Sequence, residues 1–524
     1  MPPHSLDATS GLTSVDWIVI ASYGVGMVLV GWYYSRRTKT AEDYLLGGRN
    51  MRPWAVGLSM FATLLSTISY LSYPGEVIPY GPMILTQIAA YPLIFWVIGW
   101  FLIPRIMKLK VTTAYEILDA RFGASIHMLG SLIFLTLRLL WMATIIYVTT
   151  SKVLIPLLGW EQDRAPLLCA VLGVVTIIYT SLGGLRAVVV TDVVQTAILL
   201  GAAILTLVLI TRYFGGVGAW WPDQWYEHWP EPVWGFDPSA RISFGGMFLS
   251  GFTWYVCTSG SDQMAIQRYL ATRDVKSARW VLLVSLTTDI VLASFLGLLG
   301  LALLAYFLKN PQLVPAGLSL FEGKDADKIF PHFVMTALPS GITGLVVAGL
   351  LAAAMSSLSS GVNSSSSVIT VDLIGRFRRK PLAGAAHVRI ARWSSVAVGA
   401  AVVGLSLYGS LVPGNIVELC YRVVNLLVTP LFLLFFMALF VPWATPFGTW
   451  VGALTGMAVA LAIGFSEELF RYLEIFPGSD GISFLWIMPY SFLAGALAGL
   501  LASLLPVGPP AKSMLVDAKT ADAD

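Results

Sequence analysis

Apolar stretches of about 20 residues, each long enough to cross a lipid bilayer as a helix, recur along almost the whole chain. Only 12% of the 524 residues are charged and 57% are hydrophobic, whereas a soluble domain carries about 25% charged residues. We therefore predict an all-α polytopic membrane protein with about 13 transmembrane helices. The stretches begin near Val15, Trp54, Ile84, Ile126, Pro166, Ala187, Phe244, Trp280, Ile342, Trp393, Ile416, Gly448 and Phe484.

Basic residues are concentrated in some of the loops. Clusters of lysine and arginine follow the first, third and seventh stretches, and the largest cluster spans 376–380, whereas the tryptophan-rich loop 215–240 contains no lysine or arginine. Because basic loops stay in the cytoplasm, this pattern places the N-terminus outside and the C-terminus inside. We expect a multi-pass protein of the plasma (inner) membrane, with a short extracellular N-terminus (1–14), a transmembrane domain (15–505) and a disordered cytoplasmic tail (506–524).

Residues 350–368 combine an apolar background with a run of small hydroxyl-bearing side chains. At about 100° per residue, many of them share one face of a helix, with Ser359 at its edge. Hydroxyl and carbonyl oxygens at short range suit a hard cation. Small residues also allow membrane helices to pack closely, so the pattern alone leaves both readings open. The residues on this face are Ala353, Ser356, Ser357, Ser360, Asn363, Ser364 and Ser367.

Ionisable side chains inside predicted spans are costly in a membrane and are therefore functional candidates. Asp192 lies about two helical turns into its span, near the cytoplasmic end, where it can bind a cation, pair with Arg186 or extend to water. Arg138 lies deeper in another span. Its guanidinium suits either a carboxylate on a solute or a structural ion pair with Asp289 or Glu418.

Two predicted helices are interrupted by hydroxyl-bearing residues, glycine and proline, at 62–76 and 245–261. Interrupted helices are tolerated in a membrane only where their backbone lines a cavity or is buried in protein. Paired interruptions in two halves of a chain point to a binding site near the midplane. The two interrupted helices are about five spans apart, which fits two five-helix units of opposite orientation at about 52–212 and 242–442.

Four motifs then carry a family resemblance. They are Pro74-Gly75-Glu76; Gly183-Gly184-Leu185 with Thr191-Asp192 and Gln195; Phe244-Gly245-Gly246 with Asp262-Gln263 and Gln267-Arg268-Tyr269-Leu270; and the run from Ala353 to Asn363. On these motifs the chain resembles the sodium/solute symporter family over roughly residues 15–470. The family includes sodium-coupled sugar, proline, monocarboxylate, iodide, multivitamin and sialic acid carriers. The resemblance implies a LeuT-like 5+5 inverted repeat, with one helix before it and two after it.

The resemblance also implies three sets of site residues. A first sodium ion would bind the backbone carbonyls of Ala62, Leu65 and Ala353 and the hydroxyls of Ser356 and Ser357. A second sodium ion would bind Asp192, Ser356, Ser359 and Ser360. The substrate would contact Ser66, Ser69, Gln87, Trp254 and Thr258, with Arg138 as an anchor for an anion.

Together these features predict a transporter rather than an enzyme. We expect a sodium-coupled symporter that imports a small polar or anionic organic solute, such as a carboxylate or a sialic-acid-like compound, by alternating access. Alternatives are a sodium/sugar symporter, a proton-coupled carrier using Asp192, and a solute sensor that does not transport. The coupling ion would be one or two sodium ions, and the expected partners are a small-molecule substrate and the lipid bilayer. A net charge of +3 predicts no nucleic-acid partner, and we expect no obligatory protein partner.

Overall fold

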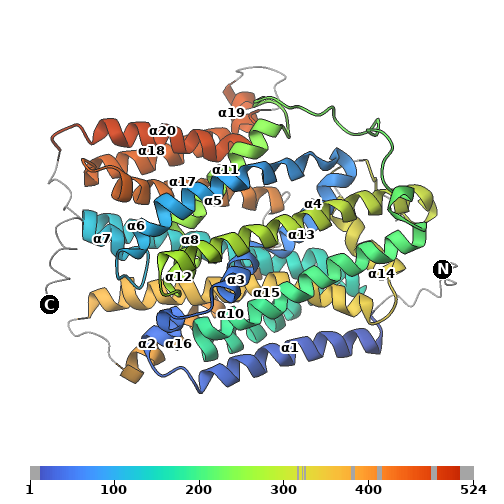
Figure 1. Cartoon of the computed structure of the whole chain (residues 1–524), viewed down its shortest axis with the longest axis horizontal. Coiled ribbons are helices and arrows are strands. Elements are labelled where there is room, and N and C mark those ends of the chain that lie inside the picture. The colour runs from blue at the N-terminus through green and yellow to red at the C-terminus, as the bar shows by residue number, and fades with distance from the viewer. Residues whose placement is uncertain are drawn as a thin grey trace.

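The structure, a computed structural model, describes residues 12–314, 318–321, 323, 326–378, 384–409, 416–473 and 481–507. Most of the predicted N-terminal segment and cytoplasmic tail therefore lie outside the described residues. The described chain is helical, and its only β pairing is an isolated bridge between Val233 and Ser243. The long helices run side by side as one bundle (Figure 1). The α-helices are α1 (Ser14–Ser35), α2 (Ala41–Leu46), α3 (Pro53–Leu64), α4 (Thr67–Tyr80), α5 (Tyr91–Val97), α6 (Ile103–Met107), α7 (Glu116–Phe122), α8 (Ala124–Tyr147), α9 (Ile155–Leu158), α10 (Ala165–Phe214), α11 (Phe244–Ser261), α12 (Gln263–Leu270), α13 (Val275–Lys309), α14 (Ile329–Ala337), α15 (Ile342–Val368), α16 (Gly384–Ser406), α17 (Ile416–Phe440), α18 (Pro446–Gly464), α19 (Ser466–Leu473) and α20 (Ile487–Ala502).

Several long helices are continued by short segments of tighter or wider winding. The 3₁₀ segment η2 (Pro82–Ala90) leads into α5, and η3 (Ile98–Leu102), a π-helical segment, joins α5 to α6. Two further π-helical segments, η4 (Val148–Leu154) and η9 (Ile369–Gly375), extend α8 and α15. Each of these segments therefore belongs to a longer apolar span.

Within the described residues, nine helical segments are long and apolar enough to cross a membrane, or ten with the bent pair α3 and α4. This number is lower than the number of apolar stretches in the sequence for identifiable reasons. The stretches that begin near Pro166 and Ala187 both fall in α10, and α11 and the described apolar part of α17 fall outside this set. The expectation of an integral, multi-pass protein is confirmed, whereas the exact number of 13 helices is not.

α10 is not one straight helix, because Gly184 interrupts it with φ 61° and ψ −159°. A left-handed φ favours glycine, which has no Cβ to clash. Space is also short: a Cβ on Gly184 would lie 2.6 Å from the backbone oxygen of Tyr44. The motif Gly183-Gly184-Leu185 therefore contains a break between two helical segments.

The serine-rich helix α15 lies inside the bundle. Its apolar window is 83% buried, the largest share among the candidate spans of the described chain. α15 packs against α10, α1, α8, α16 and α3. Ser366, on another side of the helix, donates to the backbone oxygen of Ala391 on α16 at 2.9 Å. Close packing and a polar face thus coexist on this helix.

The first interrupted helix bends sharply between α3 and α4, which meet at 67°. Leu65 and Ser66 between them are extended, with ψ of 134° and 168°. The Ser66 hydroxyl accepts from the backbone N–H of Ser69 at 3.2 Å and so caps α4. This break falls within the hydroxyl-rich stretch of the sequence, as predicted.

The second break lies between α11 and α12, where Asp262 is extended with φ −81° and ψ 125°. The Asp262 carboxylate accepts from the backbone N–H of Met264 at 2.8 Å, which caps α12. The break comes directly after the predicted stretch 245–261, whose glycines remain helical. Gly251 is one of them, and it gives Gln87 of η2 room to pack against α11.

Candidate functional site

The break in the first helix meets the polar face of α15. The hydroxyl of Ser356 lies 2.8 Å from the backbone oxygen of Ala62 and 3.1 Å from that of Ala353. The hydroxyl of Ser357 lies 2.6 Å from the backbone oxygen of Leu65. The structure therefore brings together all five residues that the resemblance assigns to the first sodium ion.

The bent helix supplies these acceptors for a simple reason. The last four carbonyls of a helix have no partner within it, and α3 ends at Leu64. Each serine hydroxyl now donates to a carbonyl, and its lone pairs remain available to a cation. Neutral oxygens at such spacing are ligands that hard cations accept. The chemistry of this cluster fits a hard, singly charged cation.

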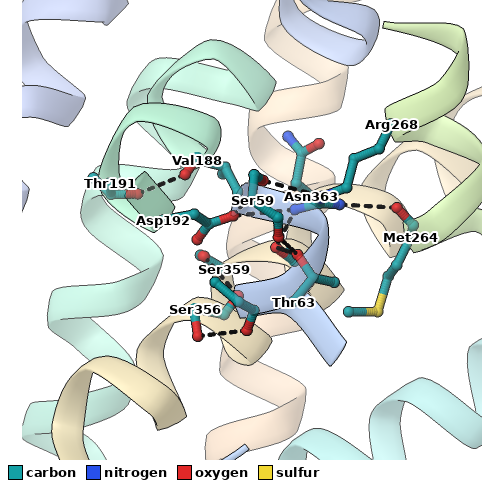
Figure 2. A network of polar contacts seen from close by, with 12 residues as sticks. Ser59, Thr63, Val188, Thr191, Asp192, Met264, Arg268, Ser356, Ser359 and Asn363 are labelled. Atoms are coloured by element: carbon teal, nitrogen blue, oxygen red, sulfur yellow. Dashed lines mark hydrogen bonds and ion pairs between the residues drawn. The ribbon is translucent and has the colours of Figure 1, made fainter. Parts of the chain in front are cut away.

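A second polar cluster surrounds Asp192 of α10 (Figure 2). Its Oδ2 accepts from the hydroxyl of Ser59 at 2.6 Å and from the Nη2 of Arg268 at 3.2 Å. The side chains of Asp192 and Arg268 are fully buried. The Oδ1 of Asp192 is buried too, and it has no hydrogen-bond partner among the described residues. One carboxylate oxygen is thus used by the protein, and the other remains open to a ligand.

Arg268 of α12 holds several parts of this cluster together. Its Nε donates to Ser59 at 3.0 Å, its Nη1 to the backbone oxygen of Met264 at 2.9 Å, and its Nη2 to the hydroxyl of Ser360 at 2.5 Å. Thr63 donates its proton to the backbone oxygen of Ser59 at 2.6 Å, so Ser360 is the donor in its 2.8 Å bond to Thr63. Ser360 therefore keeps one lone pair free.

The remaining residues of the predicted second sodium site lie beside this carboxylate. The hydroxyl of Ser359 donates to the backbone oxygen of Ser356 at 3.0 Å. Figure 2 shows Ser359 and Ser356 near Asp192, on the side away from Arg268. The arrangement can hold a cation between the open oxygen of Asp192 and the serine hydroxyls.

The ion pair of Asp192 differs from the one expected from sequence. Arg186 does not reach it and instead lies 3.1 Å from Asp43 and 3.0 Å from the backbone oxygen of Gly47. The sequence groups Arg268 with the basic residues of a cytoplasmic loop, whereas its side chain is fully buried. Its position in the motif from Gln267 onward is the only sequence signal that sets Arg268 apart.

Arg138 of α8 forms an ion pair with Asp262 at the break between α11 and α12. The expected structural pair with a buried acid is therefore present, but the acid is Asp262 and not Asp289, and the side chain of Glu418 lies outside the described residues. The Nε of Arg138 is buried and has no hydrogen-bond partner within the described chain. The guanidinium thus keeps a donor that its ion pair does not use.

The other predicted substrate contacts belong to α4, η2 and α11. The hydroxyls of Ser66 and Ser69 lie 3.3 Å apart at the start of α4. Gln87 is half-buried and donates to Tyr73. Trp254 is half-buried, while Thr258, one turn further along α11, is buried with an unpartnered hydroxyl. Apart from the Ser66–Ser69 pair, no hydrogen bond within the described chain joins these residues to one another, but all lie on helices that pack around the two breaks.

One polar cluster next to these residues was not predicted. Asp289 of α13 accepts from the hydroxyls of Tyr91 on α5 and Tyr255 on α11. The two hydroxyls lie 3.4 Å apart. The sequence marks Asp289 as an acid inside a span but gives no sign of its tyrosine partners, which are far away along the chain.

Comparison with known proteins agrees with this geometry. The model of the sodium:solute symporter family matches residues 44–458. The chain is 32% identical to the sodium/sialic acid symporter SiaT of Proteus mirabilis, over 74% of this chain and 76% of that protein. It is 31% identical to the sodium/sialic acid symporter NanT of Aliivibrio fischeri, over 75% of this chain and 76% of that protein.

More distant relatives and solved structures agree. The chain is 27% identical to sodium-coupled monocarboxylate transporter 1 of Homo sapiens, over 87% of this chain and 74% of that protein. A structure of a Na⁺-coupled sialic acid symporter, in a substrate-bound outward-open state, matches with a TM-score of 0.81 and 27% identity, covering 96% of this chain and all of that one. The chain belongs to the sodium:solute symporter family, and sodium is its coupling ion.

Proposed function

We propose that this symporter imports a sialic acid or a closely related acidic sugar together with sodium by alternating access. Two relatives whose alignments cover about three quarters of this chain are named as sodium/sialic acid symporters. The observation that carries the sodium-coupled mechanism is the set of five oxygens between the α3–α4 break and α15.

The first sodium ion is proposed to bind this set and hold α15 against the bent helix. Without the ion, hydrogen bonds of Ser356, Ser357, Ser360 and Thr67 join the two parts. With the ion, carbonyl and hydroxyl oxygens from both parts share one positive charge. A solute that binds at the same break then stabilises the same arrangement. By linkage, sodium and the solute each raise the affinity for the other.

The second sodium ion is proposed to bind the open oxygen of Asp192 with Ser356, Ser359 and Ser360. Arg268 already balances the charge of the Asp192 carboxylate. When the sodium ion leaves, the carboxylate therefore stays paired with Arg268. Each sodium moved inward gains about 2.3 kcal/mol per 100 mV. A second ion therefore raises the maximal accumulation ratio by about fifty-fold.

The solute is proposed to lie between the two helix breaks, near Ser66, Ser69, Gln87, Trp254 and Thr258. Arg138 is the proposed anchor for its carboxylate. Its unpartnered Nε supports this role, because a guanidinium offers five donors and the ion pair leaves some of them open. The carboxylate would share Arg138 with Asp262 rather than displace it.

We further propose about 13 spans arranged as a 5+5 inverted repeat with one helix before and two after; this number follows if α10 is counted as two spans and α11 and α17 as one span each. The start of α1 and the end of α20 lie at opposite ends of the bundle, which fits an odd number of crossings (Figure 1).

The basic end of the bundle is proposed to face the cytoplasm, which leaves the N-terminus outside and the C-terminus inside. Arg49 donates to the backbone oxygen of Val111 at 2.7 Å, and Arg376 lies 3.0 Å from Asp119. These contacts join the basic segments after the first and third apolar stretches and the basic cluster at 376–380.

Thermal stabilisation of the purified protein tests the substrate class. The panel comprises N-acetylneuraminate, pyruvate, galactose and proline, each in sodium and in potassium at matched pH. We expect N-acetylneuraminate to stabilise the protein in sodium only. Stabilisation by another member of the panel would replace the proposed substrate, and equal stabilisation in both salts that grows at low pH would favour proton coupling.

A further inference from the structure

The carboxylate of Asp289 lies in the middle of a long apolar helix. It is about 21 Å along α13 from Val275 and about 30 Å from Lys309, at 1.5 Å per residue. Only 9% of the residue is exposed. A carboxylate at this depth is costly unless it is paired or has a ligand.

Its surroundings differ from those of the other two carboxylates near the helix breaks. Asp192 has Arg268 and Asp262 has Arg138, whereas Asp289 has no cationic partner among the described residues. The two tyrosines that it contacts, Tyr91 and Tyr255, both donate to its Oδ2. No partner of its Oδ1 is found in the described part of the chain.

The tyrosine pair fixes this carboxylate from two other helices. The rings of Tyr91 and Tyr255 are 5.2 Å apart at 66°. An aspartate side chain held by two donors on one oxygen has little freedom to rotate, so its second oxygen keeps a defined direction. A hydrogen-bond acceptor fixed in this way favours ligands that carry a donor at the matching position.

The same cluster touches the proposed solute site. Tyr255 follows Trp254, and the two rings lie 4.9 Å apart in an edge-to-face arrangement. Thr258 is one helical turn further along α11. Gln87, one turn before Tyr91, packs against α11 at Gly251. The tyrosines that hold Asp289 are therefore neighbours of three candidate contacts, Gln87, Trp254 and Thr258, and the cluster does not lie in a separate part of the bundle.

We propose that Asp289, positioned by Tyr91 and Tyr255, is a specificity-determining residue that accepts a hydrogen bond from a hydroxyl group of the solute. This inference rests on the proposed solute site. Arg138 then binds the acidic group and Asp289 binds a hydroxyl, so the protein selects acids that also carry hydroxyl groups over simple carboxylates. The charge of Asp289 makes this bond stronger than one to a neutral acceptor.

The test compares the full-length variant Asp289→Asn with wild type. An asparagine whose oxygen keeps the two tyrosine bonds presents an N–H₂ group where the solute needs an acceptor. Affinities are measured in sodium for N-acetylneuraminate, for its 4-deoxy, 9-deoxy and C7-truncated analogues, and for pyruvate. We expect the variant to bind N-acetylneuraminate about tenfold or more weakly. The loss should disappear for the analogue that lacks the bound hydroxyl.

Two further variants keep the test decisive. Thr288→Val is the matched control, because Thr288 is on the same helix and its hydroxyl bonds only to the backbone oxygen of Val284 at 2.7 Å. Tyr255→Phe is the second test, for the case that Asp289→Asn does not fold. It removes one tyrosine donor and leaves the carboxylate in place, so it should weaken N-acetylneuraminate binding by a few fold. Stabilisation by sodium alone should be unchanged in all three variants.

An equal loss for every analogue, or no loss for any, would overturn the role of Asp289. If wild type binds galactose instead of N-acetylneuraminate, the proposed substrate is wrong, and Asp289→Asn must then weaken galactose binding for the inference to stand. If the wild-type protein binds only pyruvate, which has no hydroxyl group, both fail.

Discussion

The guanidinium of Arg268 lies 3.2 Å from the carboxylate of Asp192, and both side chains are completely buried. Ser59 links the same two groups, since it donates to Asp192 at 2.6 Å and accepts from Arg268 at 3.0 Å. The acid that the sequence marks as a cation ligand therefore has a permanent positive partner. A sodium ion at this place adds to an ion pair instead of neutralising a lone carboxylate.

Removing one partner of this pair should be costly. Arg268→Met leaves Asp192 buried without a counter-charge, and we expect a loss of about 3–5 kcal/mol in the free energy of unfolding. The double variant with Asp192→Leu should lose less than the sum of the two single variants. Denaturant unfolding in detergent measures this. Arg186→Met is the control, because its pair with Asp43 is partly exposed and should contribute only about 0–1 kcal/mol.

The first sodium site should depend on Ser357. Ser357→Ala removes a proposed ligand and the 2.6 Å contact with Leu65, so the sodium concentration that gives half-maximal solute binding should rise about tenfold or more. Ser364→Ala is the matched control, because its hydroxyl bonds at 3.1 Å to its own helix at Gly361. An equal effect in both variants would mean that these serines act in helix packing.

The second sodium site should depend on Ser359, which belongs to that set alone. Ser359→Ala should reduce the number of sodium ions moved per solute from about two to about one, and it should lower solute accumulation by about fifty-fold at 100 mV. Parallel fluxes of labelled sodium and solute in proteoliposomes give this ratio. An unchanged ratio in the variant would rule out the second ion at Asp192.

The break in α10 should tolerate only glycine. Gly184→Ala forces a side chain into a left-handed conformation and within 2.6 Å of the Tyr44 backbone oxygen, so we expect a loss of about 1–3 kcal/mol. Gly201→Ala, in the same helix with nothing within 4 Å of its Cβ, should be neutral or stabilising by up to about 1 kcal/mol. Thermal unfolding of the two variants side by side makes the comparison.

Local patterns in the sequence are sufficient to predict part of this architecture. The helical period alone predicts a common face for Ser356, Ser357 and Ser360, and the hydroxyl-rich run predicts the bend at Leu65 and Ser66. Both follow from residues close together in the chain, where backbone geometry fixes which side chains share a face. Their convergence at one place could be inferred only from the family resemblance.

Pairings between distant segments could not be read in this way. Arg268 is 76 residues from Asp192, and apart from its place in the family motif nothing local distinguishes it from Arg273, which is exposed. The partner of Arg138 is Asp262, which stands out in the sequence only as part of a family motif, directly after the predicted break at 245–261. Asp289 likewise gains its tyrosine partners only through packing of α5, α11 and α13.

Uptake of labelled N-acetylneuraminate into proteoliposomes, with an inward sodium gradient or a matched potassium gradient, tests the central claim most directly. We predict accumulation above the external concentration in the sodium gradient only, with loss of this accumulation in Ser357→Ala. Equal uptake in the two gradients, or accumulation driven by a proton gradient without sodium, would contradict the account.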